Sequence, residues 1–384
     1  MALKAELGFG MMRLPVKNGN ATDFDYDHLN KMVDAYLAGG YNYFDTSYVY
    51  HNGKSEEAVR KAVVERHPRE AIRIATKFPT FLLKPGDEDK IEAYFQEQLD
   101  RLGVDYIDYY LLHNFQTRWY DGFDGNGGVI QSEHLIEHAL KWKAEGKIRH
   151  LGFSFHSSAK LLDRILTEHP EFEFVQIAAN YVDWNSQLVQ AGPCYDVIRK
   201  HGKDVIIMEP VKGGGLAKVP ETVERMLKAK DPERSVASWA IRFAGSMDGL
   251  ICCLSGMSTL EQVEDNLRTY KELAPISDEE KRWLAEDVNA AYRAAGPAGD
   301  LSKYEGLKLC GVPVSAIMEA WSVCQLQPDP GFSDDNNYLL NAIAEEAHLN
   351  FADELPRETL VTMSGEDVTE AVYAAYEWLR ANTF

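Results

Sequence analysis

Short apolar runs alternate with longer amphipathic runs over residues 1–275 of the chain. The short runs have the length and composition of β-strands, and they span residues 7–14, 41–46, 72–77, 106–113, 148–154, 174–177, 204–208 and 250–254. The longer runs place apolar residues at helical spacing; the first one carries Leu29, Met32, Val33, Tyr36 and Leu37. A strand followed by a helix, repeated about eight times, predicts an α/β fold of the (β/α)8 TIM-barrel class. A doubly wound sheet is the alternative, but the first strand lacks the G-x-G-x-x-G turn that such a sheet would want.

Residues 276–384 do not continue this alternation. Their patterns are mostly helical, and the first helix has Ser277 as a predicted N-cap with acidic residues in its first turn. This part holds 20 Asp and Glu against 7 Lys and Arg, a net charge of −13 out of −20 for the chain. We therefore expect a barrel in residues 1–275 and an acidic, mostly helical C-terminal extension in residues 276–384, whose charge favours solubility.

Composition excludes several classes of protein. The net charge of −20 argues against nucleic-acid binding, which depends on Lys and Arg. No apolar run approaches the roughly 20 residues of a membrane span, and the N-terminal residues do not read as a signal peptide, so we expect a cytoplasmic protein without membrane contact. The five cysteines form no C-x-x-C pair, and all five are predicted to be reduced, buried structural thiols without a metal.

Four polar residues stand at or just beyond the ends of three predicted strands: Asp45, Tyr50, Lys77 and His113. The carboxyl ends of barrel strands meet at one rim, where the following loops form active sites. Each residue also has a simpler interpretation, such as a loop cap for Asp45, an exposed loop lysine for Lys77 or a hydrogen-bonded rim histidine for His113. Four concordant placements make coincidence a weaker explanation, so we predict one site.

An acid, a phenol, an amine and an imidazole together can deliver a proton to a carbonyl that is being reduced. Hydride transfer leaves an alkoxide, and a phenol with a pKa of about 10 is a reluctant donor at neutral pH. A neighbouring ammonium lowers that pKa, a carboxylate keeps the ammonium charged, and an imidazole polarises the carbonyl. We predict these roles for Lys77, Asp45 and His113 around Tyr50 as the general acid. Tyr48 is a competing phenol.

The motifs around these residues resemble those of the aldo-keto reductases. The likeness covers about residues 7–273 and includes GFGMMRLP, FDTSYVYHNGKSEEAVRKAV, IATK, DYYLLHN, IRHLGFSFH, FVQIAANYVDWN, IIMEPVKGGGLA and SGMSTLEQVEDN. The resemblance implies a nicotinamide dinucleotide across the barrel mouth and a small carbonyl or alcohol substrate. It also implies a set of cofactor-binding residues: Ser154, Gln176, Met208, Val211, Gly213, Gly215, Leu216, Ser255, Met257, Ser258, Gln262 and Asn266.

Within this set, the resemblance assigns the carboxamide of the cofactor to Ser154 and Gln176. It assigns the pyrophosphate to the loop of residues 211–216 and the adenosine end to residues 255–266. The run GGGLA independently suits phosphate, because glycine lets backbone N–H groups approach closely and phosphate sites in barrels form after the last two strands. A plain flexible loop is the alternative.

Several positions depart from the family pattern. Phe155 and His156 follow Ser154 where an asparagine is typical, and Met208 stands where an aromatic residue often stacks on the nicotinamide ring. These changes affect the contacts expected with the ring.

The choice between NADP and NAD rests on residues 255–266. A 2′-phosphate is normally bound by Lys or Arg, but Gly256 and Gln262 stand at the positions where basic residues are expected. Nearby hydroxyl groups could still bind a phosphate, whereas Glu261 and Glu264 would repel one. We expect NADP, with NAD as the alternative.

The motifs MEPVKGGGLA and SGMST most resemble one branch of the family, which carries a C-terminal ferredoxin-like domain with paired four-cysteine motifs. Only Cys310 and Cys324 occur in the C-terminal extension of this chain, and a cluster requires four thiolates. We therefore expect a degenerate ferredoxin-like region without an Fe-S cluster, which packs on the barrel and shapes the substrate mouth or the interface of a homo-oligomer.

The long segment after His113, FQTRWYDGFDGNGGVIQ, is expected to line the substrate pocket. Its aromatic residues, together with one from NYVDWN, suit a sugar or an aromatic carbonyl; the substrate-binding candidates are Trp119, Tyr120, Phe123 and Trp184. Arg118 could bind a carboxylate. The alternative is that about half of these aromatic residues only anchor the loop.

These observations predict an oxidoreductase that reduces an aldehyde or ketone with NAD(P)H. A dinucleotide-binding sensor or scaffold with little turnover is the alternative. A metal-dependent barrel hydrolase or isomerase is disfavoured, because no H-x-H pair or cluster of histidines and carboxylates stands at the strand ends with ligand spacing.

Overall fold

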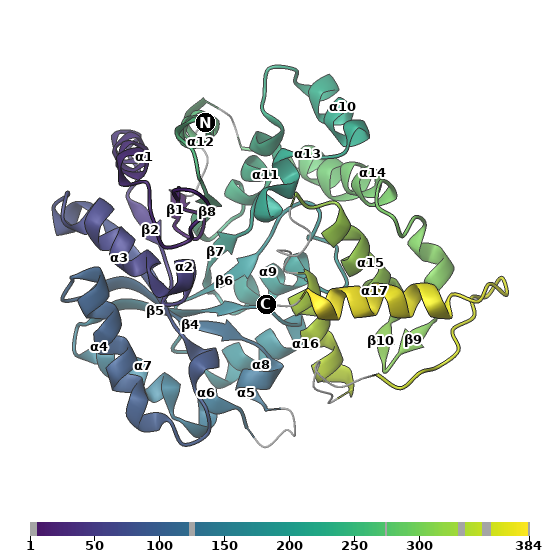
Figure 1. Cartoon of the computed structure of the whole chain (residues 1–384), viewed down its shortest axis with the longest axis horizontal. Coiled ribbons are helices and arrows are strands. Elements are labelled where there is room, and N and C mark those ends of the chain that lie inside the picture. Colours follow the sequence, from purple (N-terminus) through teal and green to yellow (C-terminus); the bar gives the residue numbers. More distant parts are fainter. Residues whose placement is uncertain (1–5, 123–126, 273–274, 329–334, 348–354, 383–384) are drawn as a thin grey trace.

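The computed structural model of the chain describes residues 6–122, 127–272, 275–328, 335–347 and 355–382. Eight parallel strands close into a barrel in sequence order (Figure 1), which confirms the predicted (β/α)8 architecture. The strands are β1 (Glu6–Gly10), β2 (Tyr43–Asp45), β3 (Arg73–Phe78), β4 (Ile107–Phe115), β5 (Ile148–Phe155), β6 (Phe174–Ala178), β7 (Asp204–Met208) and β8 (Leu250–Gly256). The barrel closes where β1 pairs with β8, with Gly10 opposite Gly256.

Helices surround the barrel. They are α1 (Tyr26–Ala38), α2 (Tyr50–Gly53), α3 (Ser55–Val59), α4 (Ile91–Leu102), α5 (Thr117–Tyr120), α6 (Val129–Ser132), α7 (Leu135–Ala144), α8 (Ala159–Glu168), α9 (Ala191–Lys200), α10 (Glu221–Lys230), α11 (Val236–Gly245) and α12 (Leu260–Glu272). Short 3-10 or π turns add η1 (Arg60–Val64), η2 (Arg69–Ala71), η3 (Thr80–Leu82), η4 (Glu88–Lys90) and η5 (Lys212–Ala217). The pattern of α1 explains its position: the carboxylate of Asp25 caps the N–H of His28, and four of the five predicted apolar positions are buried against the sheet.

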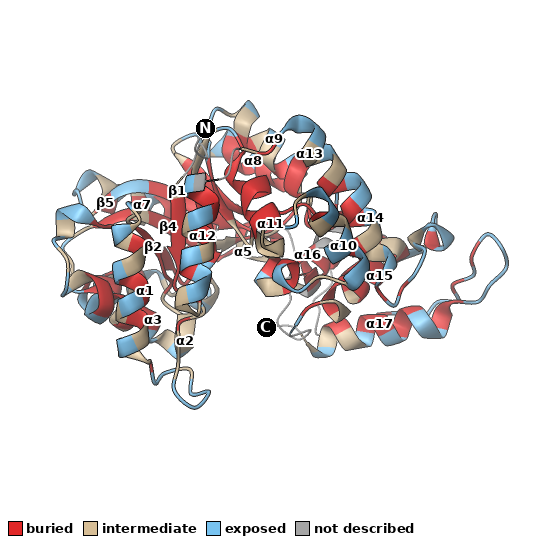
Figure 2. Cartoon of the chain, turned by 90° about the horizontal axis from the view of Figure 1, so that it is seen from above, coloured by how far each residue is buried: buried red, intermediate tan, exposed pale blue. Residues whose placement is uncertain are grey.

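Two apolar layers hold the barrel together. The interior is filled by a cluster that contains Tyr43, Leu111, Phe174 and Ile206, while a larger cluster lies between the strands and the helices. Figure 2 shows this burial along the strands and the inner faces of the helices. A Cβ at Gly8 would lie 2.3 Å from the Sγ of Cys252, so the filled interior requires glycine there.

The C-terminal extension is mostly helical, as predicted. It contains α13 (Asp278–Trp283), η6 (Leu284–Val288), α14 (Asn289–Ala294), η7 (Leu301–Tyr304), β9 (Lys308–Leu309), β10 (Val312–Pro313), α15 (Val314–Gln325), α16 (Asp335–Ala347) and α17 (Thr369–Ala381). Helix α15 packs against both α16 and α17, α14 packs on α10, and α16 reaches α5 in the loop after β4. The kinship of this region with a ferredoxin-like domain stays a prediction.

Four cysteines are buried as predicted, and Cys310 is half-buried. In the described part of the chain, no helix is long and apolar enough to cross a membrane.

Candidate active site

The structure brings Asp45, Tyr50, Lys77 and His113 together at the carboxyl ends of β2, β3 and β4. The Lys77 Nζ donates to Asp45 Oδ1 at 2.6 Å and to the carbonyl of Thr46 at 2.7 Å. The same Nζ lies 4.9 Å from the centre of the Tyr50 ring. Asp45 and Lys77 are buried, whereas Tyr50 and His113 are half-buried. A fixed ammonium therefore lies beneath a phenol that solvent can reach.

The environment keeps Lys77 charged and Tyr50 protonated. Burial is the largest single influence and favours the neutral amine, but the charges and hydrogen bonds of Asp45 and Tyr50 together outweigh it, so the pKa of Lys77 is raised. Burial raises the pKa of Asp45, and Lys77 acts in the opposite direction. Burial also raises the pKa of Tyr50, while the charge of Lys77 and its hydrogen bond to the hydroxyl lower it. Lys77 thus acts in the predicted direction, but burial is the larger effect.

The loop that carries Tyr50 is held in an unusual backbone conformation. His51, Asn52 and Gly53 follow Tyr50 with φ values of +53°, +53° and +79°. Left-handed backbone is costly for residues other than glycine, and it persists where other contacts fix it. Here the backbone N–H of Leu14 donates to His51 Nε2 at 3.0 Å, so Nδ1 carries the proton and donates to the Ala21 carbonyl at 2.8 Å. We had not predicted His51 as an anchor, although a His-Asn-Gly run directly after the phenol was a possible signal.

The His113 ring stands edge-on beside the Tyr50 ring. Its ring centre lies 6.3 Å from that of Tyr50 and 5.4 Å from that of Phe81 in η3. Its Nδ1 is 3.2 Å from the hydroxyl oxygen of Ser47. Burial, followed by the charges of Lys77 and His156, lowers the pKa of His113 well below its usual value. The imidazole is therefore neutral near pH 7 and offers one donor and one acceptor.

The competing phenol, Tyr48, faces away from this group. Its hydroxyl donates to Glu97 Oε2 on α4 at 2.7 Å, and the guanidinium of Arg101 lies 4.0 Å above its ring. Burial and the bond to Glu97 raise the pKa of Tyr48 to about 12. Tyr48 therefore ties the loop to α4, and Tyr50 is the phenol beside Lys77.

A second polar cluster lies directly behind Lys77. Glu56 of α3 accepts from the Thr76 hydroxyl at 2.7 Å and from Gln98 Nε2 at 2.8 Å, and the same Nε2 also donates to the Lys77 carbonyl at 3.0 Å. Glu56 is completely buried, and burial raises its pKa to about 7. This cluster was not predicted, because an acid within a helical pattern is normally solvated.

The candidate nicotinamide residues line β5, β6 and β7. Ser154 and Gln176 are paired across β5 and β6, and both are buried. Gln176 Nε2 donates to the sulfur of Met208 at 3.4 Å, and its Oε1 has no hydrogen-bond partner among the described residues. A buried amide oxygen without a donor is costly, so this position suits a ligand that offers an N–H group, such as a carboxamide.

The glycine-rich loop forms η5 after β7. Gly213 and Gly214 adopt φ values of +62° and +101°, and a Cβ at Gly214 would meet open space. Gly215 differs, because its Cβ would lie 2.3 Å from the side-chain oxygen of Gln327 in the C-terminal extension. Val211 is half-buried and the Leu216 side chain is fully buried, so Leu216 could offer a ligand only its backbone.

The segment after β8 is internally hydrogen-bonded. Ser255 Oγ accepts from Asn266 Nδ2 at 2.7 Å, and the N–H of Ser258 donates to Gln262 Oε1 at 2.7 Å. Met257 is fully buried, so it too could offer only its backbone. These contacts fix the shape of the proposed adenosine segment.

Arg13, from the loop after β1, reaches this segment. Its carbonyl accepts from the Ser258 hydroxyl at 2.7 Å, and its Nη1 lies 3.7 Å from the position that a Cβ of Gly256 would take. A cation thus stands beside one of the two positions where a basic residue was expected and missing. We had not predicted Arg13, because its link to Ser258 spans 245 positions.

The predicted substrate residues lie in different places. Trp119 is half-buried on α5, with the Arg118 guanidinium 5.5 Å from its ring. Tyr120 is fully buried and its hydroxyl donates to Glu168, so it anchors α5 to α8 rather than facing a ligand. Phe123 lies outside the described residues.

Trp184 packs against the outer helices. Its ring lies 5.7 Å from Tyr195 of α9 and 5.5 Å from Phe243 of α11. Phe81, whose ring lies 5.4 Å from that of His113, is a neighbour of the site that the sequence did not predict.

The fold and the site define an oxidoreductase of the (β/α)8 class. A profile of the aldo/keto reductase family matches residues 6–286, and the chain belongs to that family. The oxidoreductase YqkF of Bacillus subtilis is 24% identical over 322 residues, which cover 76% of this chain and 95% of the relative.

Solved structures share the barrel. The holo form of aldo-keto reductase AKR11C1 from Bacillus halodurans aligns with a TM-score of 0.57 and 24% identity, over 75% of this chain and 95% of its own. An aldo-keto reductase from Klebsiella pneumoniae in complex with NADPH aligns with a TM-score of 0.56 and 21% identity, over 74% of this chain and 90% of its own. Most of the C-terminal extension lies beyond the family match.

Proposed function

We propose that this protein reduces an aldehyde or ketone to an alcohol, with a nicotinamide dinucleotide as the reductant and Tyr50 as the general acid. The observation that carries the proposal is the geometry of Lys77, whose ammonium is held by Asp45 at 2.6 Å directly beneath the Tyr50 ring. His113, whose ring lies 6.3 Å from that of Tyr50, completes the proposed proton-delivery site at the barrel mouth.

The residues present fit the cofactor. Gln176 Oε1, buried without a donor, would accept from the carboxamide, and the Ser154 hydroxyl beside it can donate. The open left-handed backbone at Gly213 and Gly214 suits the pyrophosphate. When bound, the cofactor supplies the hydride, and the Klebsiella pneumoniae relative was solved with NADPH.

The side chains at the mouth would then handle the proton and the carbonyl oxygen. The Tyr50 hydroxyl donates its proton to the developing alkoxide, and the Lys77 ammonium stabilises the phenolate that remains. His113 Nδ1 lies 3.2 Å from the Ser47 hydroxyl oxygen. In the tautomer in which Ser47 donates to Nδ1, the ring proton is on Nε2, which can then hydrogen-bond to the carbonyl oxygen. Asp45 keeps Lys77 charged and in place.

We further propose that NADPH is the preferred cofactor. Gly256 and Gln262 provide no charge for a 2′-phosphate, but the Arg13 guanidinium reaches the space beside Gly256. A guanidinium suits a phosphate in both geometry and charge. Arg13 would therefore supply, from the loop after β1, the cation that the segment after β8 lacks.

The substrate class is a small aldehyde or ketone, with a sugar or aromatic carbonyl as candidates. Phe81 beside His113 and Trp119 on α5 support an aromatic-lined pocket. Tyr120 and Trp184, which pack into the helical layer, are left out of this proposal.

The test is the Tyr50→Phe variant, with Tyr48→Phe as the matched control. Tyr50→Phe removes the proposed proton donor, so turnover of NADPH with a panel of aldehydes and ketones should fall by about 100-fold or more. The dissociation constant for the cofactor, measured by fluorescence titration, should stay within about twofold.

Tyr48→Phe should retain turnover, because its hydroxyl contacts Glu97 and not the site. Near-normal turnover of Tyr50→Phe would sink the mechanism. Absence of binding of both NADPH and NADH to the unmodified protein would overturn the proposed function as a whole.

A further inference from the structure

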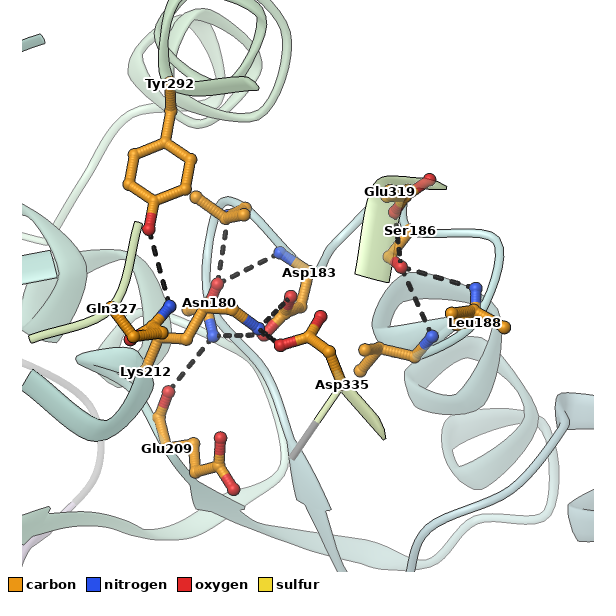
Figure 3. Close-up of polar contacts among 12 residues, drawn as sticks. Asn180, Asp183, Ser186, Leu188, Glu209, Lys212, Tyr292, Glu319, Gln327 and Asp335 are labelled. Atoms are coloured by element: carbon orange, nitrogen blue, oxygen red, sulfur yellow. Dashed lines mark hydrogen bonds and ion pairs between the residues drawn. The ribbon is translucent and has the colours of Figure 1, made fainter. Parts of the chain in front are cut away.

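The glycine-rich loop and the C-terminal extension share one buried group of charges (Figure 3). Lys212, the first residue of η5, places its Nζ 2.7 and 2.8 Å from the two carboxylate oxygens of Asp183 in the loop after β6. The same Nζ lies 2.8 Å from Asp335 Oδ2, at the first residue of α16. All three side chains are at most 4% exposed. The barrel supplies two members of this charge triad, and the extension supplies the third.

Lys212 has a strained backbone. Its φ is +45°, in the left-handed region that disfavours residues with a Cβ. Such conformations persist where surrounding contacts over-determine them. Lys212 lies directly before Gly213 and Gly214, which provide the open part of the loop. The contacts that fix the Lys212 side chain therefore also help to fix the backbone of the loop.

The extension touches the same loop at a second point. The Gln327 amide fills the space where a Cβ of Gly215 would stand, 2.3 Å from its oxygen, and its Nε2 donates to the Tyr292 hydroxyl at 3.4 Å. Glycine at position 215 is thus explained by packing against the extension. Lys212 and Gly215 are held on either side of the two open glycines.

Helix α16 also reaches across the mouth. The Asn341 side chain donates to the carbonyl of His156, just after β5, and the ring of Tyr338 lies 5.9 Å from the His156 ring. One helix of the extension therefore contacts the loop after β7 at Lys212 and the loop after β5 at His156. These two loops flank β6, which carries Gln176.

We propose that the C-terminal extension completes the dinucleotide site, and that Asp335 is a positioning residue for the glycine-rich loop. Asp335 acts through Lys212: by pairing with its ammonium, it holds the loop of residues 211–216 in the conformation that leaves Gly213 and Gly214 open to a pyrophosphate. This inference rests on the proposed function, because the ligand of the loop is the dinucleotide of that reaction.

Electrostatics make Asp335→Asn a clean perturbation. Asparagine has nearly the same shape, and the variant leaves Lys212 paired with Asp183, so no single charge is left buried alone. The variant loses only the ion pair between Lys212 of the loop and Asp335 of α16. Glu319→Gln is the matched control, because Glu319 is also a buried acid of the extension and bridges Arg293, at 2.8 Å, and the Ser186 hydroxyl, at 2.8 Å. Among the described residues, the side-chain partners of Glu319 are Ser186 and Arg293, and Figure 3 shows Glu319 beside Ser186 and apart from Lys212.

The experiment compares the dissociation constants of NADPH and NADH for the full-length protein and these variants by fluorescence titration. A loop that no longer stays in its competent conformation binds more weakly in proportion to the lost population, and strain of the usual size corresponds to roughly 5- to 150-fold. We expect Asp335→Asn to raise both dissociation constants at least about fivefold, with kcat at saturating cofactor nearly unchanged. Asp335→Glu, which retains the charge, should recover part of the affinity.

Glu319→Gln should leave both dissociation constants within about twofold, even if its urea midpoint falls as far as that of Asp335→Asn. Equal effects of the two variants on cofactor affinity, or none for Asp335→Asn, would overturn the inference and leave the extension as packing alone. If the unmodified protein binds neither NADPH nor NADH, the proposed function fails, and the inference fails with it. Binding to the unmodified protein and to Asp335→Asn with equal affinity overturns only the inference.

Discussion

At the scale of single residues, the backbone and the side chain of Arg13 have separate roles in the proposed preference for NADPH. The hydrogen bond from Ser258 to its carbonyl positions the backbone of the loop after β1, whereas its guanidinium provides the charge beside Gly256. A substitution that keeps the backbone bond and removes the charge can therefore test the charge alone.

Arg13→Gln should weaken NADPH binding by roughly 10- to 100-fold, since one charge-assisted hydrogen bond contributes about 1.5–3 kcal/mol. NADH has no 2′-phosphate, so its dissociation constant should change by less than about twofold. Fluorescence titration with both cofactors measures this difference. Arg225→Gln, at an exposed arginine of α10, should change neither constant. An equal loss for both cofactors would show that Arg13 supports the fold of the segment and does not select the phosphate.

Single residues also show where sequence reasoning reaches its limit. The four proposed catalytic residues were predictable because strand ends of a parallel barrel meet at one rim, whatever the details of packing. The aromatic residues of the loop after β4 were not, because composition says nothing about which way a ring turns. Tyr120 is buried and donates a hydrogen bond to Glu168 of α8, and no sequence pattern near Tyr120 predicts that partner.

At the scale of elements, the cluster around Glu56 joins α3, β3 and α4 next to Lys77. Glu56 accepts hydrogen bonds from the side chains of Thr76 and Gln98, and Gln98 Oε1 accepts one from the Tyr110 hydroxyl at 2.5 Å. Burial raises the pKa of Glu56 to about 7, above its value of 4.5 in a free side chain. The folded protein therefore binds an extra proton between pH 4.5 and 7.

This shift predicts how stability depends on pH. The stability associated with the protonated form is fully present below pH 4.5 and is lost as pH rises through about 7. The amide of Glu56→Gln does not titrate, so the variant does not lose this stability as the pH rises. Relative to the wild type, its free energy of unfolding should therefore increase by roughly 2–3 kcal/mol between pH 5 and pH 8. Urea unfolding at the two pH values measures this change. A difference that does not depend on pH would mean that Glu56 ionises as readily in the folded protein as in the unfolded chain.

Elements were predictable to within a few residues where apolar periodicity is strong. The strand predicted for residues 204–208 matches the observed β7, and each of the other predicted strands overlaps an observed one. The first predicted strand is too long. It was predicted to run to residue 14, whereas β1 ends at Gly10: the Met11 N–H makes one more bond to β2, at the Asp45 carbonyl, and the chain then turns at residues 11–12. Apolar side chains continue beyond the strand there, and hydropathy alone cannot separate a buried loop from a strand.

At the scale of the whole molecule, the barrel and the extension share one contiguous apolar cluster in addition to the charge triad of Lys212, Asp183 and Asp335. The helical nature of the extension was predictable from its patterns, but its docking was not. The contact between Lys212 and Asp335 joins residues 123 positions apart in the sequence, and neither residue stands in a local pattern that indicates burial.

Removing the central charge should destabilise the whole protein. Lys212→Met would leave Asp183 and Asp335 buried beside each other without a cation, and breaking a buried ion pair in this way costs about 3–5 kcal/mol. Urea unfolding at pH 7 should show that loss. In the Lys212→Met, Asp335→Asn double variant one of the two carboxylates is gone, so part of the stability should return. A loss below about 1 kcal/mol in the single variant would show that the two acids are accommodated without Lys212.

The ribosome synthesises the three residues of the charge triad at different times. Asp183 is synthesised before Lys212, and Asp335 follows Lys212 by 123 residues, which takes roughly 6–25 s at about 5–20 residues per second. During that interval Lys212 has Asp183 as its partner, so the barrel can bury a neutral pair as soon as β8 has emerged and closed on β1. The barrel is then assembled before its last charged contact exists. Synthesis of α16 then adds the second carboxylate, Asp335, which on the inference above fixes the glycine-rich loop in its open conformation.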